Sequence, residues 1–278
     1  MSFTAADVKR LREETDAPMM ECNAALKEAN GDYDRAKEIL REKGKAAAAK
    51  RSDRSTAAGL VALATKPGKV AGVVVECETD FVSGNADFQA SVQAMADSVL
   101  ANLGAGATLD QALAITVNGH SLKDEVEALV GKIRENIVLK KVLVLEGAQY
   151  GYYLHHTKDK AAIVTFDGGN DGSEPVAKDL AMQVVSLTPA VLSKDNLSQE
   201  MLDKEMKIEI DRALQEGKPE EMAKKIAEGR VNKEFVKSVV LMEQPFFKDG
   251  SINVSQHVAN NGGGMKVLAF DRLFVGQE

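Results

Sequence analysis

The sequence VVVECETDFV, residues 73–82, changes from a strand pattern to a helix pattern, and the fold of the chain is interpreted outward from this change. Its first three residues are valines, which are β-branched and favour a pleated, half-buried strand. After them the side chains alternate, so Cys77 and Thr79 fall on one face and the glutamates beside them fall on the other. The stretch therefore predicts a strand that ends near Thr79.

The end of this strand pattern is a corner. Thr79 and Asp80 are residue types that cap helices, and a helical pattern follows from about Ala86. Phe81 and Val82 therefore lie where the strand changes to the helix. A large apolar residue in such a place usually packs in the core, so spacing alone predicts that Phe81 is buried.

Residues 1–44 predict three short helices. A capping-box pattern at Thr4–Asp7 begins the first helix, Pro18 suits the first turn of the second, and Asp32 can cap the third. Gly44 is expected to end the third helix. The residues predicted to face inward are Val8, Leu11, Thr15, Met19, Cys22, Ala25, Leu26, Ala29, Ala36, Ile39 and Leu40.

Met19 and Met20 are adjacent, so both cannot point into one small core. We expect one to pack in the core and the other to contact a partner, because an exposed Met provides an adaptable apolar surface. Residues 45–54, KAAAAKRSDR, are rich in Ala and basic residues and predict a helical linker. A domain boundary is therefore expected near residue 54.

The next part, residues 55–140, has the pattern of a β-hairpin backed by helices. Strands are predicted at Leu60–Thr65 and Val70–Thr79, with the turn sequence KPGK between them. A helix with Phe88, Val92, Met95 and Val99 on one face follows, and another spans about Leu122–Glu135, with Val126, Leu129, Val130 and Ile133 as its apolar stripe.

A second unit of similar pattern follows. Its strands are predicted at Ile137–Leu145, Tyr150–His155 and Ala161–Phe166, and its helix at Pro175–Leu187. We interpret the two units as α+β halves of related shape, an internal repeat in pattern but not in sequence. The second subdomain is expected to span residues 141–278.

Two further helices and one strand are predicted in this second subdomain. Ser198–Glu216 and Pro219–Gly229 read as a helical hairpin within residues 190–229, and Met265–Val275 reads as a final strand in a C-terminal module at about 255–278. The fold class is therefore α+β, with antiparallel sheets and helices. The hairpin stripes are Leu202, Met206, Ile210, Ala213 and Leu214 on one helix, and Met222 and Ile226 on the other.

Composition argues against several classes of function. The net charge is −7 and aromatic residues make up only 5% of the chain, which disfavours a non-specific nucleic-acid binder. Residues 1–54 hold 12 basic and 11 acidic side chains, a net charge of +1, so the other 224 residues carry −8. The basic side chains near residues 41–54 are expected to be solvated.

The two cysteines, Cys22 and Cys77, are far apart in the sequence and lie on apolar faces, so we expect buried thiols in a reducing cytoplasm. The polar start of the chain predicts no signal peptide. No apolar run approaches the ~18 residues that a membrane-spanning helix requires, so we expect no contact with a membrane.

No enzyme signature is present. The sequence lacks the phosphate-binding motif GxxxxGK[ST], the metal motif HExxH and paired cysteines, so we expect no enzymatic activity, bound metal or cofactor. Among the four histidines only His155 and His156 are neighbours. Adjacent side chains on a strand face opposite ways, which disfavours one shared metal.

Several stretches resemble the bacterial elongation factor Ts family. The resemblance runs from the first helix to Val275 and also includes the pair Tyr153 and His155 in a Tyr-x-His element. The matching stretches are LREETDAPMMECNAAL (11–26), ANGDYDRAKEILREKG (29–44), ETDFV (78–82), RENIVLKK (134–141) and QPF (244–246).

This resemblance implies a guanine-nucleotide exchange factor for the GTPase elongation factor Tu. Residues 1–54 would form a ubiquitin-associated-like domain that grips the nucleotide-binding domain of the GTPase, and the helical hairpin would be a coiled-coil insertion. Such an insertion is implicated in self-association in some members. An ordinary satellite hairpin without a role in self-association is an equally weighted alternative. GDP, GTP and Mg²⁺ would belong to the partner.

The resemblance also implies roles for particular residues. Phe81 would be a wedge that dislocates Mg²⁺ from the partner, with Asp80 acting near the metal and Thr79 fixing the corner. Val82 would pack beside Phe81. The residues implied to bind the partner are Leu11, Met19, Met20 and His155, the last of these near the phosphate-binding loop of the GTPase.

The sequence departs from the family at a few positions. Asp16 and Arg134 stand where the family usually has Gly, and Pro18 stands where it has a small residue. Lys141 replaces an Arg. Ser83-Gly84 replaces an Ala and a basic residue beside the wedge, so the corner keeps its apolar point and lacks a neighbouring charge.

Two other functions compete with exchange. A ubiquitin-associated-like adaptor would carry its partner affinity in residues 1–54 alone and would bury Phe81 in a scaffold. An enzyme with an unrecognised site is disfavoured by the missing motifs. The exposure of Phe81 in the folded chain distinguishes the adaptor from the exchange factor.

Overall fold

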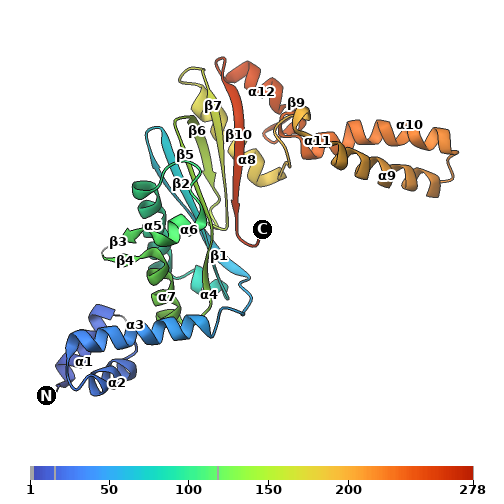
Figure 1. Ribbon diagram of the computed structural model, residues 1–278. Helices are drawn as coiled ribbons and strands as arrows, with labels where there is room; N and C mark the ends of the chain where they lie inside the picture. Colours follow the sequence, from blue (N-terminus) through green and yellow to red (C-terminus); the bar gives the residue numbers. More distant parts are fainter. Residues whose placement is uncertain (1–2, 16, 118, 278) are drawn as a thin grey trace. The chain divides into compact units, whose positions relative to one another are not determined.

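The computed structural model describes residues 3–15, 17–117 and 119–277 and shows the expected α+β class, with helices and small antiparallel sheets (Figure 1). Asp16, one of the departures from the family pattern, lies outside the described residues. The chain divides into two compact units. The first contains the residues up to 146 together with 157–159 and those from 273 on; the second contains 147–156 and 160–272.

Three helices begin the first unit: α1 (Ala5–Thr15), α2 (Met19–Glu28) and α3 (Tyr33–Ala49). The predicted capping box is confirmed, because the Asp7 carboxylate accepts from the Thr4 amide at 2.7 Å while the Asp7 amide donates to Thr4 Oγ1 at 3.3 Å. The inward faces form one small apolar core, whose buried members are Val8, Leu11, Cys22, Ala25, Leu26, Ala29, Ala36, Ile39 and Leu40.

The expectation that Gly44 ends the third helix is wrong, because α3 continues through it to Ala49. Gly44 instead lies against α7 (Leu122–Ile133), where a Cβ added to Gly131 would come within 3.2 Å of the Gly44 Cα. The lack of a side chain at Gly131 therefore allows the two helices to approach closely. The helical linker that we predicted for residues 45–54 is helical only as far as Ala49.

Ion pairs flank this close approach of α3 to α7. Arg41 Nη2 lies 2.5 Å from Asp124 Oδ2, and Lys45 Nζ lies 2.9 Å from Asp124 Oδ1. The Lys45 ammonium and the Ser121 cap hold the pKa of the Asp124 carboxyl well below its usual range. Much of the basic charge near residues 41–54 is therefore paired within the chain.

The first sheet has the order β1-β2-β5, with β1 (Ala58–Lys66) and β5 (Ile137–Glu146) both antiparallel to β2 (Lys69–Cys77). The prediction of a half-buried strand is wrong, because all nine residues of β2 are buried. The expectation that residues 137–145 begin the second unit is also wrong. This strand pairs along β2 from Cys77↔Ile137 to Lys69↔Glu146.

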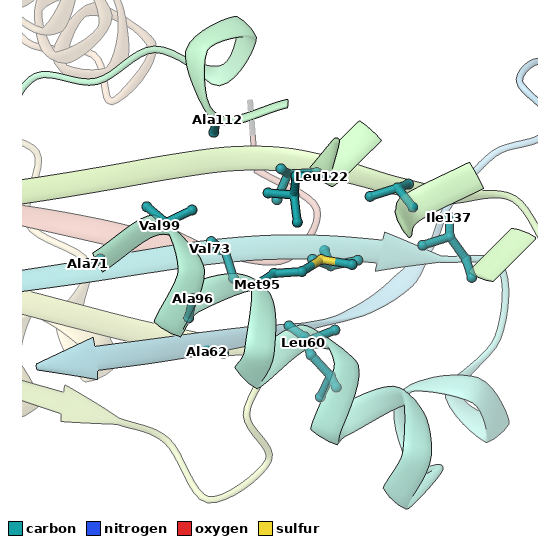
Figure 2. Packing of buried hydrophobic residues seen from close by; sticks show 14 of the residues in the cluster. Leu60, Ala62, Ala71, Val73, Met95, Ala96, Val99, Ala112, Leu122 and Ile137 are labelled. Atoms are coloured by element: carbon teal, nitrogen blue, oxygen red, sulfur yellow. The ribbon is translucent and has the colours of Figure 1, made fainter. Parts of the chain in front are cut away.

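One face of this sheet packs against α5 (Ala86–Asn102), as the helical pattern from Ala86 predicted. Figure 2 shows Met95 and Val99 of α5 among side chains from β1 and β2. Cys77 belongs to this cluster, and burial raises the pKa of its thiol to about 11. Other buried members are Leu60, Ala62, Ala64, Ala71, Val73, Val75, Phe88, Val92, Ala96, Ala112, Leu122, Val126, Val130, Ile137, Leu139 and Val144.

The second unit is built on the sheet β10-β7-β6, with α8 (Ser173–Leu187) packed on one face. Gly151 lets α8 approach closely, since a Cβ there would lie 2.5 Å from the Lys178 backbone nitrogen. The predicted strands and helix of this region are all present. Their bounds are β6 (Gln149–Leu154), β7 (Lys160–Asp167) and β10 (Lys266–Phe274).

The predicted helical hairpin is formed by α9 (Gln199–Gln215) and α10 (Glu220–Arg230) (Figure 1). Arg230 ties the two helices, because its guanidinium lies 3.2 Å from the buried Glu209 carboxylate and 2.9 Å from that of Glu216. The stripe predicted for the second helix is wrong at Met222, which is exposed. Ala223 and Ala227 face α9 instead and allow close packing.

Gln244 and Phe246 of the QPF stretch are buried in the second unit, whereas Pro245 between them is exposed. The Gln244 side-chain amide donates to the Ser238 carbonyl at 2.7 Å, and its oxygen accepts from Gln183 at 3.0 Å. Phe246 stacks on the His257 ring at 3.8 Å, and burial lowers the pKa of His257. The stretch therefore has a clear structural role.

None of the helices in the described part of the chain is both long enough and apolar enough to cross a membrane.

The remaining elements are short. The other bounds are α4 (Asp80–Ser83), α6 (Leu109–Ala114), β3 (Thr116–Val117), β4 (His120–Ser121), the 3-10 helices η1 (Lys194–Asn196) and η3 (Leu241–Glu243), the π-helix η2 (Val231–Phe235), α11 (Val236–Val239), β8 (Pro245–Phe246), β9 (Asp249–Asn253) and α12 (Val254–Asn261).

We expect Gly44→Ala to raise the free energy of unfolding by about 0.5–1 kcal/mol, the usual gain for Gly to Ala inside a helix. The added methyl would meet only the Glu127 carbonyl oxygen at 3.8 Å, an ordinary contact. The matched variant Gly131→Ala should gain less, since its methyl would lie 3.2 Å from the Gly44 Cα. Urea denaturation followed by circular dichroism measures both, and a less stable Gly44→Ala protein would contradict the packing.

Candidate functional site

The corner at residues 79–84 exposes a large aromatic side chain. Phe81 is 87% exposed, so the prediction from spacing that it is buried is wrong. The cause is local, because α4 begins at Asp80 and turns Val82 toward the core of the first unit while Phe81 points to solvent. A fully apolar ring on the surface loses the free energy of burial, which makes this position notable.

The backbone of α4 is held at both ends. Thr79 Oγ1 accepts from the Val82 amide at 3.4 Å, which confirms the predicted capping role. The Gly84 amide donates to the Asp80 carbonyl at 2.8 Å, and the Ser83 carbonyl accepts from the Gln89 side chain at 3.1 Å. Phe81 is therefore presented by a turn with defined geometry.

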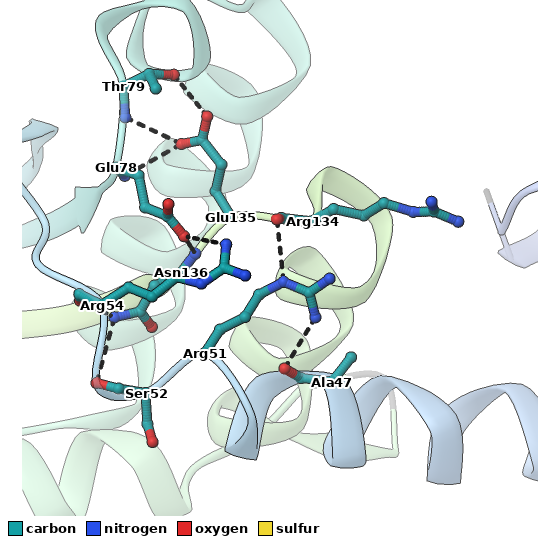
Figure 3. Close-up of polar contacts among 9 residues, drawn as sticks. All are labelled: Ala47, Arg51, Ser52, Arg54, Glu78, Thr79, Arg134, Glu135 and Asn136. Atoms are coloured by element: carbon teal, nitrogen blue, oxygen red, sulfur yellow. Dashed lines mark hydrogen bonds and ion pairs between the residues drawn. The ribbon is translucent and has the colours of Figure 1, made fainter.

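Glu135, which follows α7, braces this corner (Figure 3). Its Oε2 accepts from the backbone amides of Glu78 at 3.1 Å and Thr79 at 3.0 Å, and its Oε1 accepts from Thr79 Oγ1 at 2.6 Å. The two amides lie just beyond the last residue of β2, where the strand ladder has ended. The carboxylate supplies acceptors that the sheet no longer provides.

A second carboxylate joins the corner to the linker. Glu78 Oε1 accepts from the Asn136 amide at 2.6 Å and lies 3.3 Å from Arg54 Nη1. The Asn136 side chain in turn donates to the Arg54 carbonyl at 2.7 Å (Figure 3). The Asn136 amide and the Arg54 guanidinium lower the pKa of the Glu78 carboxyl below its ordinary value of 4.5.

Arg134 adopts the left-handed conformation, with φ of 66°. This explains why glycine suits the position, since only glycine adopts it without a steric cost. Tertiary contacts of Arg134 offset this steric cost. The Arg134 side-chain Nη2 lies 2.5 Å from Glu21 Oε1 of α2, and the Arg134 backbone carbonyl accepts from Arg51 Nε at 3.1 Å.

The N-terminal module exposes both of its adjacent methionines. Met19 is 45% exposed and Met20 is 84% exposed, so the expectation that one of them lies in the core is wrong. Leu11, which the resemblance implied to contact a partner, has no exposed surface. It packs in the three-helix core, so a direct contact would require the bundle to open.

His155 lies in the second unit, just past the end of β6. Its amide donates to the Lys160 carbonyl at 2.9 Å, and Tyr153 Oη lies 3.0 Å from its Nδ1. The expectation that His155 and His156 face opposite ways is wrong, because the strand ends at Leu154 and their ring centroids lie 4.3 Å apart. The Tyr-x-His element therefore forms one local aromatic group.

The described residues contain no group of three or more His, Cys, Asp or Glu side chains that could hold a metal ion. An open groove of about 1320 Å³ lies between the N-terminal helices and α7. Several charged side chains on its lining pair with one another, as Lys37 does with Glu14 and Arg41 does with Asp124.

The structure thus brings Thr79, Asp80, Phe81 and Val82 together on one corner of the first unit. Sequence reasoning did not find Glu135 as the brace of this corner. The signal available was the stretch RENIVLKK, which carried a family resemblance but no pattern of burial or spacing that paired Glu135 with Thr79.

Comparisons with known proteins agree with the resemblance. A family model described as Elongation factor TS matches residues 78–277, beginning at the corner. The chain is 40% identical over 279 residues to a protein named Elongation factor Ts from Levilactobacillus brevis, covering 99% of this chain and 92% of that one. It is 37% identical to proteins of the same name from Amoebophilus asiaticus and Hydrogenobaculum sp., covering 99% of this chain and 100% of each.

We expect Glu78→Gln to lower the free energy of unfolding at pH 7, and this difference from the native chain to shrink as the pH falls below 4.5. The pKa of Glu78 is lower in the folded chain than its ordinary value, so the stabilisation is present above 4.5 and is lost as the pH falls through the folded pKa. Urea denaturation at pH 7 and pH 3 measures it. A difference that does not change between these pH values would contradict the Asn136 and Arg54 contacts.

Proposed function

Since the chain belongs to the elongation factor Ts family of translation elongation factors, we propose that it binds the GDP form of elongation factor Tu and promotes exchange of GDP for GTP. It does so without making or breaking a covalent bond. The single observation that carries this proposal is the 87% exposure of Phe81 on a corner whose backbone is braced.

The exposed ring gives the corner a wedge. When Phe81 enters an apolar site on the partner, its burial contributes about 1.5–3 kcal/mol. Mg²⁺ demands near-ideal octahedral geometry, so small displacements of the GTPase elements that hold it weaken the metal and the phosphates together. Asp80, exposed beside Phe81, acts near the metal site, while Thr79 and Val82 keep the corner in place.

Exchange of this kind is negative coupling between two ligands of one GTPase. If this chain weakens GDP binding by some factor, GDP weakens binding of this chain by the same factor. One buried Phe supplies too little free energy for strong coupling and stable binding together. Met20, which is 84% exposed on α2, supplies a second apolar contact, and the half-buried His155 supplies a polar contact from the second unit.

The ubiquitin-associated-like adaptor is the competing function. It places partner affinity in residues 1–54 alone, which agrees with the exposed Met20. It also requires a buried Phe81, and the ring is exposed. Exchange therefore accounts for the exposure of both Met20 and Phe81, whereas the adaptor accounts only for that of Met20.

Further parts of the proposal concern organisation. The chain comprises a helical domain (1–54) and two core subdomains whose boundary lies near residue 146, because β5 pairs along β2 up to Glu146. It acts on the partner in the cytoplasm, and GDP, GTP and Mg²⁺ belong to the partner alone. The helical hairpin, with Ile208, Leu214 and Met222 exposed, offers a surface for self-association.

We expect Phe81→Ala to lower the maximal acceleration of GDP release by about 10- to 100-fold, because the lost burial is worth about 1.5–3 kcal/mol and each 1.4 kcal/mol corresponds to tenfold. Stopped-flow release of labelled GDP from elongation factor Tu, with and without the chain, measures this rate. Phe247→Ala removes a partly exposed Phe from the second unit and should leave the rate unchanged. Normal acceleration by Phe81→Ala would refute the wedge.

We expect Met20→Ala to raise the chain concentration that gives half-maximal acceleration about tenfold, since burial of a Met contributes about 1.5 kcal/mol or more. The maximal rate should stay close to that of the native chain, because Met20 grips the partner without acting on the metal. The same stopped-flow titration gives both values. Met222→Ala is the matched exposed Met on the hairpin, and an equal effect there would argue against a specific grip by α2.

A further inference from the structure

The carboxylate of Glu135 uses both oxygens on a single short segment. Oε2 accepts two consecutive backbone amides, those of Glu78 and Thr79, and Oε1 accepts the Thr79 hydroxyl. Hydrogen bonds to an ionised acceptor are roughly twice as strong as neutral ones. The segment just before α4 is therefore fixed by one side chain that comes from 56 residues away in the sequence.

Thr79 passes this constraint to the helix. A hydroxyl has one proton and two lone pairs. Its proton goes to Glu135 Oε1 at 2.6 Å, which leaves a lone pair that accepts from the Val82 amide at 3.4 Å. Glu135 thus selects the orientation of the Thr79 side chain that begins α4.

The helix needs this support because it is only four residues long. A single turn fixes several backbone angles for very few hydrogen bonds, so it is unstable alone. A ring on a mobile turn would lose conformational entropy on entering a partner, whereas a ring on a fixed turn has already lost it. A fixed conformation of α4 therefore lowers the entropy cost of inserting the Phe81 ring into a partner.

From these contacts we infer that Glu135 is a positioning residue for exchange: it holds the Glu78–Thr79 backbone so that α4 presents Phe81 in the orientation that enters the partner. The inference rests on the proposed exchange function and goes beyond it. Glu135 touches neither the partner nor its nucleotide in this role. It acts only through the corner.

Graded substitutions test the contacts. Glu135→Ala removes all three acceptors. Glu135→Gln keeps one side-chain oxygen for the two amides and loses the charge and the acceptor for the Thr79 proton. The maximal acceleration of labelled GDP release should fall about tenfold with Glu135→Ala, the scale of freeing one backbone residue, and less with Glu135→Gln. Equal acceleration by the native chain and both variants would overturn the inference.

A double-mutant cycle separates positioning from general stability. In the Phe81→Ala background, Glu135→Ala should cause no further loss, because its effect passes through the ring. Losses that simply multiply would overturn the inference. The control Gln93→Ala removes a bond of 3.0 Å from α5 to the Leu63 carbonyl in the same unit and should leave exchange unchanged.

Amide hydrogen exchange gives a readout that needs no partner. With Glu135→Ala, protection should fall at the Glu78 and Thr79 amides and stay native-like along β2. A loss of protection along the whole of β2 would show a general loss of stability and would overturn the positioning role. If the native chain itself fails to accelerate GDP release, the exchange function is refuted. If it does and the Glu135 variants match it, only the positioning role is refuted.

Discussion

The burial of β2 on both faces is the constraint on which the first unit depends. A central strand has its backbone groups paired with β1 and β5, and its side chains covered on both faces, so polar groups must leave the sheet at its ends. At one end the chain must then turn within two residues and find new acceptors for its amides. Glu135 supplies them, and the corner, the short helix and the exposed ring all follow from that turn.

Much of this fold could be predicted from local signals. The capping box at Thr4, the cap at Asp32 and the hairpin turn before β2 each depend on residues near one another in the sequence. Errors occurred where a distant partner decides. The local sequence at Gly44 favours the end of a helix, yet α3 continues through it, because α7 packs against this part of α3. Residues 137–146 join the first sheet because β2 has a free edge for them.

The candidate site divides in the same way. Thr79 could be identified as a cap from sequence, but the exposure of Phe81 depends on which of two adjacent apolar residues the first turn directs inward, and Val82 takes that place. Leu11 is a different case. Its helical spacing indicated a core residue, which its complete burial confirms, whereas the contact with a partner rested on the resemblance alone. Glu135 could not be found because no periodic pattern links residues so far apart.

The ties between the N-terminal helices and α7 have a consequence for behaviour in solution. Arg41 and Lys45 bind Asp124, and Arg134 binds Glu21, all at or near the surface. Added salt screens such pairs, over about 10 Å at 0.1 M ionic strength, whereas the apolar core of the three helices is not screened. Added salt therefore weakens the attraction between the N-terminal helices and α7, while the packing within the three helices is preserved.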